Sequence, residues 1–175
     1  DVEPHSMKQA DFDLTVCSAW HHFCPAVLVS SELMNAEQYW SGMTWFMSVS
    51  LMGSTQGVDT SEQPSILLVA SERAAGQLAS AMFDVAQDIA TTDQRADALG
   101  EMANIIAGHV KTALDLSGSI MSPCWHEARD VQAQWRLWAG LTSTLGCGLL
   151  LGDDPVYVML RSPQDEADAR AGEMK

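Results

Sequence analysis

Three polar residues in the segment 97–114 are spaced so that a helix would bring them together: Asp97, Glu101 and Asn104. At about 100° per residue they share a narrow stripe with Gly108. A carboxylate can pair with a cation, and a carboxamide can hold a water molecule by hydrogen bonds without being ionised or consumed. The stripe therefore groups a carboxylate and an amide on one side of the helix, where another molecule could approach them.

The opposite side of the same helix is apolar and must face a core. It carries Leu99, Ala103, Ile106, Val110 and Ala113, with Met102 and Leu114 at its margins. A glycine inside a helix costs about 1 kcal/mol of stability relative to alanine, so the presence of Gly108 in the helix requires an explanation. Close approach of another molecule to the helix beside Asn104 would explain it.

The whole stretch resembles the signature helix of the CheX/CheC chemotaxis phosphatases. That pattern has an acidic or hydroxyl residue, then Glu after three residues, Asn after two more, and Gly-Asn a turn later. Asp97, Glu101, Asn104 and Gly108 match it, and His109 stands where the family has its second Asn. CheC proteins carry two such helices and this chain has one clear copy, so the resemblance is to CheX. It extends loosely over residues 8–162.

The resemblance implies hydrolysis of the aspartyl phosphate on a CheY-like receiver domain of a response regulator. Asn104 would orient the attacking water, and Glu101 would dock on the receiver's lysine. Asp97 would extend the contact, and Gly108 would admit the partner's surface. No cofactor is expected on this chain, because the Mg²⁺ would be held by carboxylates of the receiver. The resemblance also implies a homodimer paired through sheet edges.

Two alternatives belong to other functional classes. His109 in place of Asn is compatible with a catalytically silent module that binds a receiver without hydrolysis. A dimeric scaffold with a merely solvated helix face would show no receiver affinity. Binding without turnover separates the silent module from the phosphatase, and absence of binding distinguishes the scaffold.

Composition limits the classes of partner. The chain has 175 residues, is 47% hydrophobic and carries a net charge of −14. Such an acidic chain is unsuited to nonspecific nucleic-acid binding or to anionic membrane surfaces. No apolar run approaches the roughly 20 residues that span a bilayer, and no signal peptide is visible. With its four cysteines interpreted as reduced thiols, the chain is expected to be cytoplasmic.

Other residue clusters are weaker candidates for chemistry. Cys17, His21 and Cys24 share a helical face and have side chains that bind zinc, but the same spacing is typical of core residues, and we expect no metal site. The segment 124–127 holds Cys, His and Glu, but sequence adjacency is not triad geometry. A second Glu-x-x-Asn, at Glu32–Asn35, lacks the trailing glycine and is interpreted as accidental.

Periodicity and turn residues predict an α+β fold, an antiparallel sheet packed with helices. One domain is expected over residues 8–162, with a tag or disordered start at 1–7 and a charged tail at 163–175. The predicted N-terminal elements are a helix within 8–28 that ends at or before Pro25, a polar connection at 29–40, a half-buried strand at 43–51, a loop at 53–64, a buried strand at 65–70 and a helix from a Ser71 cap to Phe83.

The C-terminal half contains the long signature helix, predicted at about 94–116 with Asp93 as its cap. After it we expect an extended segment at 120–124, a loop at 127–133, strands at 134–141 and 156–161, and a turn at 153–155; the apolar segment 146–152 is ambiguous. The strand at 156–161 is predicted to be exposed and suited to edge pairing. Aromatic residues are enriched at interfaces, and four could line a dimer seam: Trp40, Trp45, Trp135 and Trp138.

Overall fold

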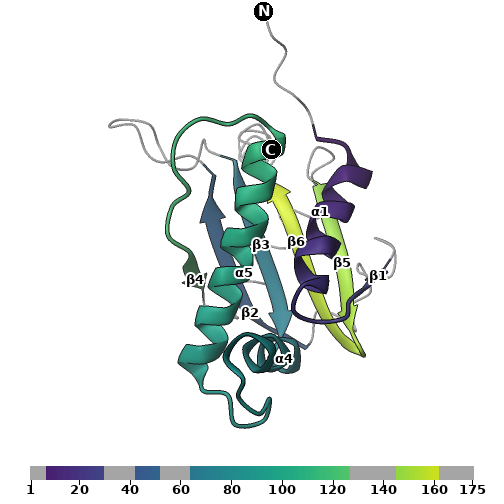
Figure 1. Cartoon of the computed structure of the whole chain (residues 1–175), viewed down its shortest axis with the longest axis vertical. Coiled ribbons are helices and arrows are strands. Elements are labelled where there is room, and N and C mark those ends of the chain that lie inside the picture. Colours follow the sequence, from purple (N-terminus) through teal and green to yellow (C-terminus); the bar gives the residue numbers. More distant parts are fainter. Residues whose placement is uncertain (1–6, 30–41, 52–63, 127–144, 162–175) are drawn as a thin grey trace, which may run out of the picture.

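The computed structural model describes residues 7–29, 42–51, 64–126 and 145–161. These residues form three helices and six strands (Figure 1). The helices are α1 (Gln9–His21), α4 (Glu72–Phe83) and α5 (Thr92–Ala113). The strands are β1 (Val27–Val29), β2 (Met43–Ser50), β3 (Ser65–Ser71), β4 (Cys124–His126), β5 (Leu145–Leu151) and β6 (Asp154–Arg161).

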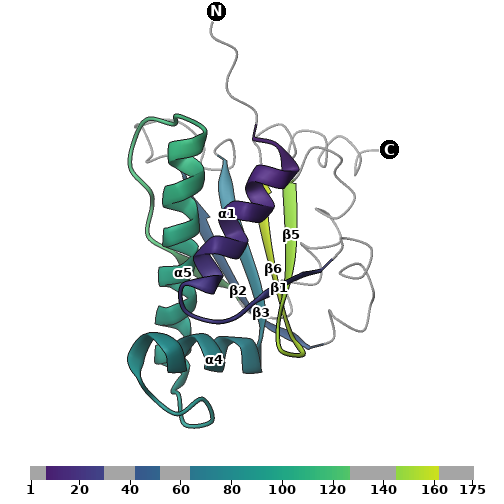
Figure 2. The same cartoon turned by 45° about the vertical axis from the view of Figure 1, so that its right-hand side comes forward.

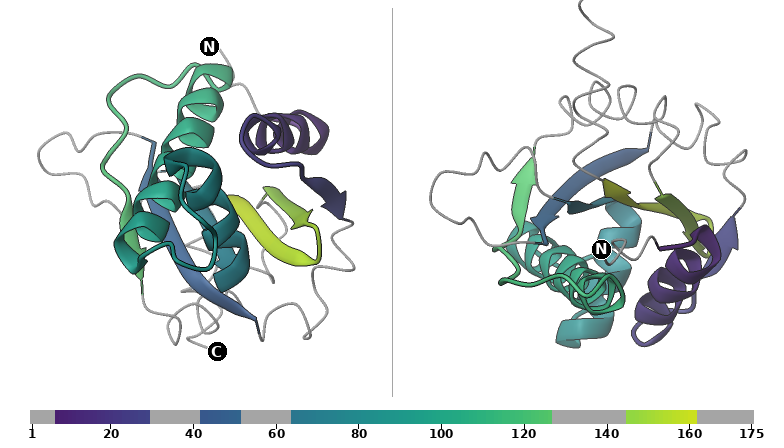
Figure 3. Two further views of the ribbon diagram at one scale, coloured as in Figure 1. Left: turned by 60° about the horizontal axis from the view of Figure 1, so that its bottom comes forward. Right: turned by 90° about the horizontal axis from the view of Figure 1, so that it is seen from above.

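All six strands form one antiparallel sheet in the order β1-β5-β6-β3-β2-β4. The helices lie together on one face of this sheet, as the views in Figure 2 and Figure 3 show. The predicted α+β architecture, with helices packed on an antiparallel sheet, is therefore confirmed. In the described part of the chain, no helix is both long and apolar enough to cross a membrane.

The main core fills the space between the helices and the sheet. Helix α5 lies over β2 and β3, and α1 packs beside it over β5. The predicted apolar side of α5 is buried, except that Ala113 is exposed because the helix ends there. The buried residues of α5 are Ala98, Leu99, Gly100, Met102, Ala103, Ile106, Ala107 and Val110.

The central strands are buried on both faces, which the alternating pattern of 43–51 did not predict. Phe46, expected on the open face of a half-buried strand, is only 2% exposed. It belongs to a second apolar cluster that also contains Met43, Leu67, Val69, Tyr157 and Met159. These residues alternate with the main-core residues of β2, β3 and β6, so the half-buried prediction for 43–51 is wrong.

Helix α4 begins as predicted, but α5 does not. The Ser71 hydroxyl accepts a hydrogen bond from the Ala74 amide at 3.2 Å, which confirms Ser71 as the N-cap. Thr91, not Asp93, caps α5, and it forms a capping box with Gln94. The Thr91 hydroxyl accepts from the Gln94 amide, and the Gln94 side-chain oxygen accepts from the Thr91 amide, so the pair satisfies two free amides. An acid inside the first turn acts only through the helix dipole.

The end of α5 and the last turn also differ from the predictions. Helix α5 ends at Ala113, before the predicted 116, and Asp115 adopts a left-handed φ of 52°. The ambiguous segment 146–152 falls largely in strand β5, and the turn after it consists of Gly152 and Asp153 rather than residues 153–155. Gly152 has φ +65°, a conformation that two-residue hairpin turns favour and that glycine adopts without strain.

The predicted edge strand 156–161 is in fact central. It lies within β6, which pairs with both β3 and β5. Periodicity reports which face of a strand is buried and carries no information on the strand's place in a sheet. Among the described strands, the edges are β4 and the short strand β1, which was not predicted. Trp45 is 5% exposed and lies in the core, so its expected place in a dimer seam is also wrong.

The remaining predictions are mostly consistent with the described residues or fall beyond them. Strand 65–70 is buried throughout as part of β3, α1 ends before Pro25, and the extended segment at 120–124 becomes a strand only from Cys124. Several features lie outside the described residues: most of the 29–40 and 53–64 connections, the second Glu-x-x-Asn, the loop at 127–133, the strand at 134–141, three of the four tryptophans and the tail at 163–175.

The capping box predicts a specific stability difference. Thr91→Ala should lower the free energy of unfolding by about 1 kcal/mol, because the Gln94 amide loses its acceptor. Thr92→Ala is the matched control, since Thr92 is the first exposed residue inside the helix and should be nearly neutral. Urea denaturation of both variants measures the difference, and equal losses would contradict the assignment of Thr91 as the cap.

Candidate functional site

The polar stripe of α5 faces solvent, as its spacing predicts. Asp97 and Glu101 are exposed, and Asn104 and Gly108 are partly exposed. Glu101 and Asn104 are three residues apart, which places their Cβ atoms about 5–6 Å from each other on a helix. Among the described residues, neither side chain has a hydrogen-bond or ion-pair partner. A carboxylate and a carboxamide are thus displayed together, ready for an external partner.

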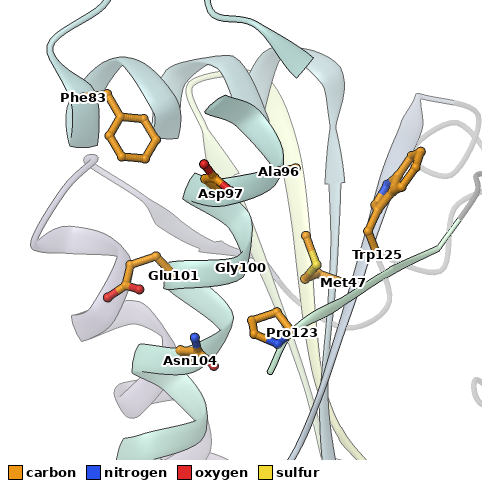
Figure 4. A pocket seen from close by; sticks show the side chains of 9 residues that line it. All are labelled: Met47, Phe83, Ala96, Asp97, Gly100, Glu101, Asn104, Pro123 and Trp125. Carbon is orange, nitrogen blue, oxygen red and sulfur yellow. The ribbon is translucent and has the colours of Figure 1, made fainter. Parts of the chain in front are cut away.

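Three of the four predicted site residues line one pocket of about 590 Å³. Asp97, Glu101 and Asn104 contribute its polar side (Figure 4). Its other described lining residues are Met47, Phe83, Ala96, Gly100, Pro123 and Trp125. The pocket therefore joins the candidate catalytic groups to an apolar and aromatic surface built by α4, β2 and the segment that enters β4.

Gly100 allows the β4 segment to approach α5 closely. A Cβ atom placed on Gly100 would lie 3.4 Å from both Cβ and Cγ of Pro123. Gly100 immediately precedes Glu101, so this contact sets the distance between β4 and the polar stripe. Of the two glycines inside α5 that follow Leu99, Gly100 has the closer packing contact, and sequence reasoning did not single it out.

Gly108 has no comparable packing role. A Cβ atom there would meet only Ile120 Cδ1, at 3.8 Å, which is ordinary van der Waals contact. Gly108 lies one turn beyond Asn104 and outside the pocket lining. The structure thus offers no intramolecular reason for this glycine, and His109 beside it is exposed.

Trp125 is held by a chain of contacts that leads through Trp45 of β2 to α4 and α5. Its ring is tilted at 43° to that of Trp45, with the centroids 5.8 Å apart. The Trp45 Nε1–H donates to Glu72 Oε2 at 2.5 Å, and the other carboxylate oxygen of Glu72 pairs with Arg95 on α5. The pocket wall formed by Trp125 is therefore fixed relative to the helix that carries Glu101.

The cysteine and histidine candidates have structural roles. The His21 Nδ1 atom accepts a hydrogen bond from the Ala26 amide at 3.2 Å. Burial raises the pKa of the Cys24 thiol, and it raises that of Cys17 with a further contribution from Asp13; both shifts disfavour the thiolate that a metal needs. Within the described ranges, no three His, Cys, Asp or Glu side chains are grouped so that they could hold a metal ion.

Sequence reasoning missed the apolar half of the pocket. Phe83 was placed only as the end of a helix, and Trp125 only as a neighbour of Cys124 in a weak nucleophile cluster. The available signal was their residue type, because large aromatic side chains near element ends can form contact surfaces. Their convergence on Glu101 depends on tertiary packing and is not visible in the spacing of the residues.

The comparisons with known proteins concern the family and the fold. The family described as "Chemotaxis phosphatase CheX" matches residues 52–137, a range that contains the whole polar stripe. The chain is therefore similar to the CheX family over this range. No curated protein sequence matches it at a significant level.

Solved structures of CheX proteins share the fold. The chemotaxis protein CheX of Vibrio vulnificus has a TM-score of 0.57 at 10% identity, covering 89% of this chain and 98% of the other. CheX in the CheX–CheY–BeF3–Mg complex of Borrelia burgdorferi has a TM-score of 0.54 at 17% identity, covering 89% and 97%. CheX of Desulfovibrio desulfuricans has a TM-score of 0.51 at 13% identity, covering 89% and 99%. At these identities, the likeness to the solved structures concerns the fold.

The open surroundings of Gly108 predict that an alanine is tolerated there. Gly108→Ala should raise the free energy of unfolding by about 0.5–1 kcal/mol, because alanine loses less backbone entropy on entering a helix. Gly100→Ala is the control and should gain less, since its Cβ must fit against Pro123. Chemical denaturation compares the two. A destabilised Gly108→Ala variant would show that Gly108 serves this chain's own packing.

Proposed function

We propose that this CheX-like chain hydrolyses the aspartyl phosphate of a CheY-like receiver domain in a response regulator. The observation that carries the proposal is the joint display of Glu101 and Asn104 on the exposed side of α5, at the rim of a pocket. The CheX family match and the existence of a solved CheX–CheY complex support a CheY-related phosphatase role.

In this proposal Asn104 positions the attacking water. An acyl phosphate is already activated, so its hydrolysis needs chiefly an in-line water and neutralisation of the phosphoryl charge. The Asn104 carboxamide can accept a hydrogen bond from the water through its oxygen and donate through its nitrogen. The receiver's carboxylates would hold Mg²⁺, which supplies the charge neutralisation.

Glu101 has a different role, because a carboxylate near the phosphoryl group is repulsive unless it is paired. We infer that it pairs with a lysine of the receiver and so sets the position of Asn104. Asp97, one turn earlier, extends the same negative stripe toward the partner. Gly108, one turn after Asn104, has no side chain, so the receiver can approach the helix backbone there. A homodimer through sheet edges also belongs to this proposal, and β1 and β4 are the edge strands of the described sheet.

His109 favours one second candidate, a receiver-binding module without catalysis. The side chain is exposed beside Gly108, where the resembling family has Asn. If the second amide is needed to complete the active surface, the chain would bind a phosphorylated receiver and leave its phosphate in place. A direct measurement of turnover beside binding separates the two candidates.

The decisive variant is Asn104→Ala. It should lower kcat for phosphate release from a phosphorylated receiver by roughly 100-fold or more, because the water loses its positioning group. Its affinity for the receiver should change little. The measurement is phosphate release from a panel of receivers, including a CheY-like one, phosphorylated by their cognate kinases. Turnover equal to that of the unmodified chain would remove the proposal.

Glu101→Gln should instead raise KM by roughly tenfold or more, since it removes one charge of a docking pair. Asp11→Asn on α1 is the matched control, because it removes an exposed carboxylate away from the stripe. An unchanged KM in Glu101→Gln would contradict the docking role. Binding of the unmodified chain without turnover would support the silent module, and absence of binding to every receiver tested would support a scaffold.

A further inference from the structure

Two exposed aromatic side chains flank the candidate catalytic stripe. Phe83 is 42% exposed and Trp125 is 51% exposed. In Figure 4 they stand on either side of the α5 segment that bears Asp97 and Glu101. Large apolar groups that remain exposed at the rim of a pocket are typical of interaction surfaces, where aromatic residues provide much of the binding free energy.

The pocket wall formed by Trp125, called the aromatic wall below, is preorganised. Trp125 packs on Trp45, and Trp45 is fixed through its hydrogen bond to Glu72. Pro123, two residues before Trp125, lies against Gly100 on α5. Binding of a partner to this wall therefore costs little free energy for ordering the side chain, which favours specific over nonspecific binding.

The charges of the pocket restrict its occupant. Among the described residues that line it, the only ionisable groups are Asp97 and Glu101, both acidic. An anionic surface would be repelled, and a purely apolar one would bury these carboxylates without partners. The complementary surface carries an apolar side chain with a lysine or arginine beside it.

We propose that the pocket between α4, α5 and β4 seats such an apolar side chain of the receiver domain, flanked by a receiver cation, and that Phe83 and Trp125 determine which receivers bind. The inference rests on the proposed function and adds a contact that the stripe alone does not supply. Phe83 and Trp125 take no part in the chemistry. They act on affinity, while Asn104 acts on turnover.

The test measures binding and turnover separately. Isothermal titration with a Mg²⁺- and beryllofluoride-loaded CheY-like receiver gives Kd, and phosphate release gives kcat and KM. Trp125→Ala and Phe83→Ala should each weaken Kd and raise KM by about tenfold or more, with kcat nearly unchanged. Leu14→Ala, which removes a 69% exposed side chain on α1, is the matched control and should leave all three constants unchanged.

Salt distinguishes the apolar contact from the charged one. The Kd penalty of Trp125→Ala should persist in 0.5 M NaCl, whereas that of Asp97→Asn should shrink, because salt screens exposed charges. Thermal unfolding of each variant establishes that the fold is intact. A penalty in Trp125→Ala that disappears at high salt would overturn the apolar contact.

The remaining outcomes separate this inference from the function on which it rests. If Asn104→Ala abolishes turnover while Trp125→Ala and Phe83→Ala bind as the unmodified chain does, the docking inference is overturned and the phosphatase stands. If the unmodified chain binds no receiver, both the docking inference and the proposed phosphatase function are overturned. If Trp125→Ala leaves receiver affinity unchanged and converts a dimer to a monomer in sedimentation, the wall serves a second copy of this chain and the inference is overturned.

Discussion

Burial of one side of α5 is the constraint on which the rest of the structure depends. Leu99, Met102, Ala103, Ile106 and Val110 are fully buried against the sheet and its neighbouring helices. With those side chains buried, the helix cannot rotate without exposing them, at a free-energy cost of roughly 1.5–3 kcal/mol for each large one. The opposite side is therefore held toward solvent, and Glu101 and Asn104 have no hydrogen-bond or ion-pair partner among the described residues.

The position of β4 depends on the same helix. Its incoming segment packs the Pro123 ring against α5, where a Cβ atom on Gly100 would lie 3.4 Å from Pro123 Cβ and Cγ. Trp125 then meets Trp45, whose indole is tied to Glu72 and through it to Arg95 of α5. Helix α5 thus carries the polar stripe and contacts the segments that hold Trp125, so both halves of the pocket are built around one helix.

This arrangement suits a reaction that needs positioned groups from the protein and little acid or base catalysis. An activated phosphoryl group requires orientation of a water and a partner held in register. No strongly perturbed acid or base is required, and the polar groups can remain exposed until the partner covers them. The proposed roles follow from this requirement. The amide of Asn104 orients the water, the carboxylate of Glu101 docks on the receiver, and the aromatic side chains contribute affinity.

The sequence by itself determined the helix, its two sides and the family resemblance, because helical periodicity is local and each residue's side follows from its number. Ser71 as a cap and 65–70 as a buried strand were predictable for the same reason. The central place of β6, the burial of Phe46 and the convergence of Phe83 and Trp125 on Glu101 were decided only by the tertiary structure. Strand order and contacts between distant segments arise from packing across the chain, which the spacing of neighbouring residues does not encode.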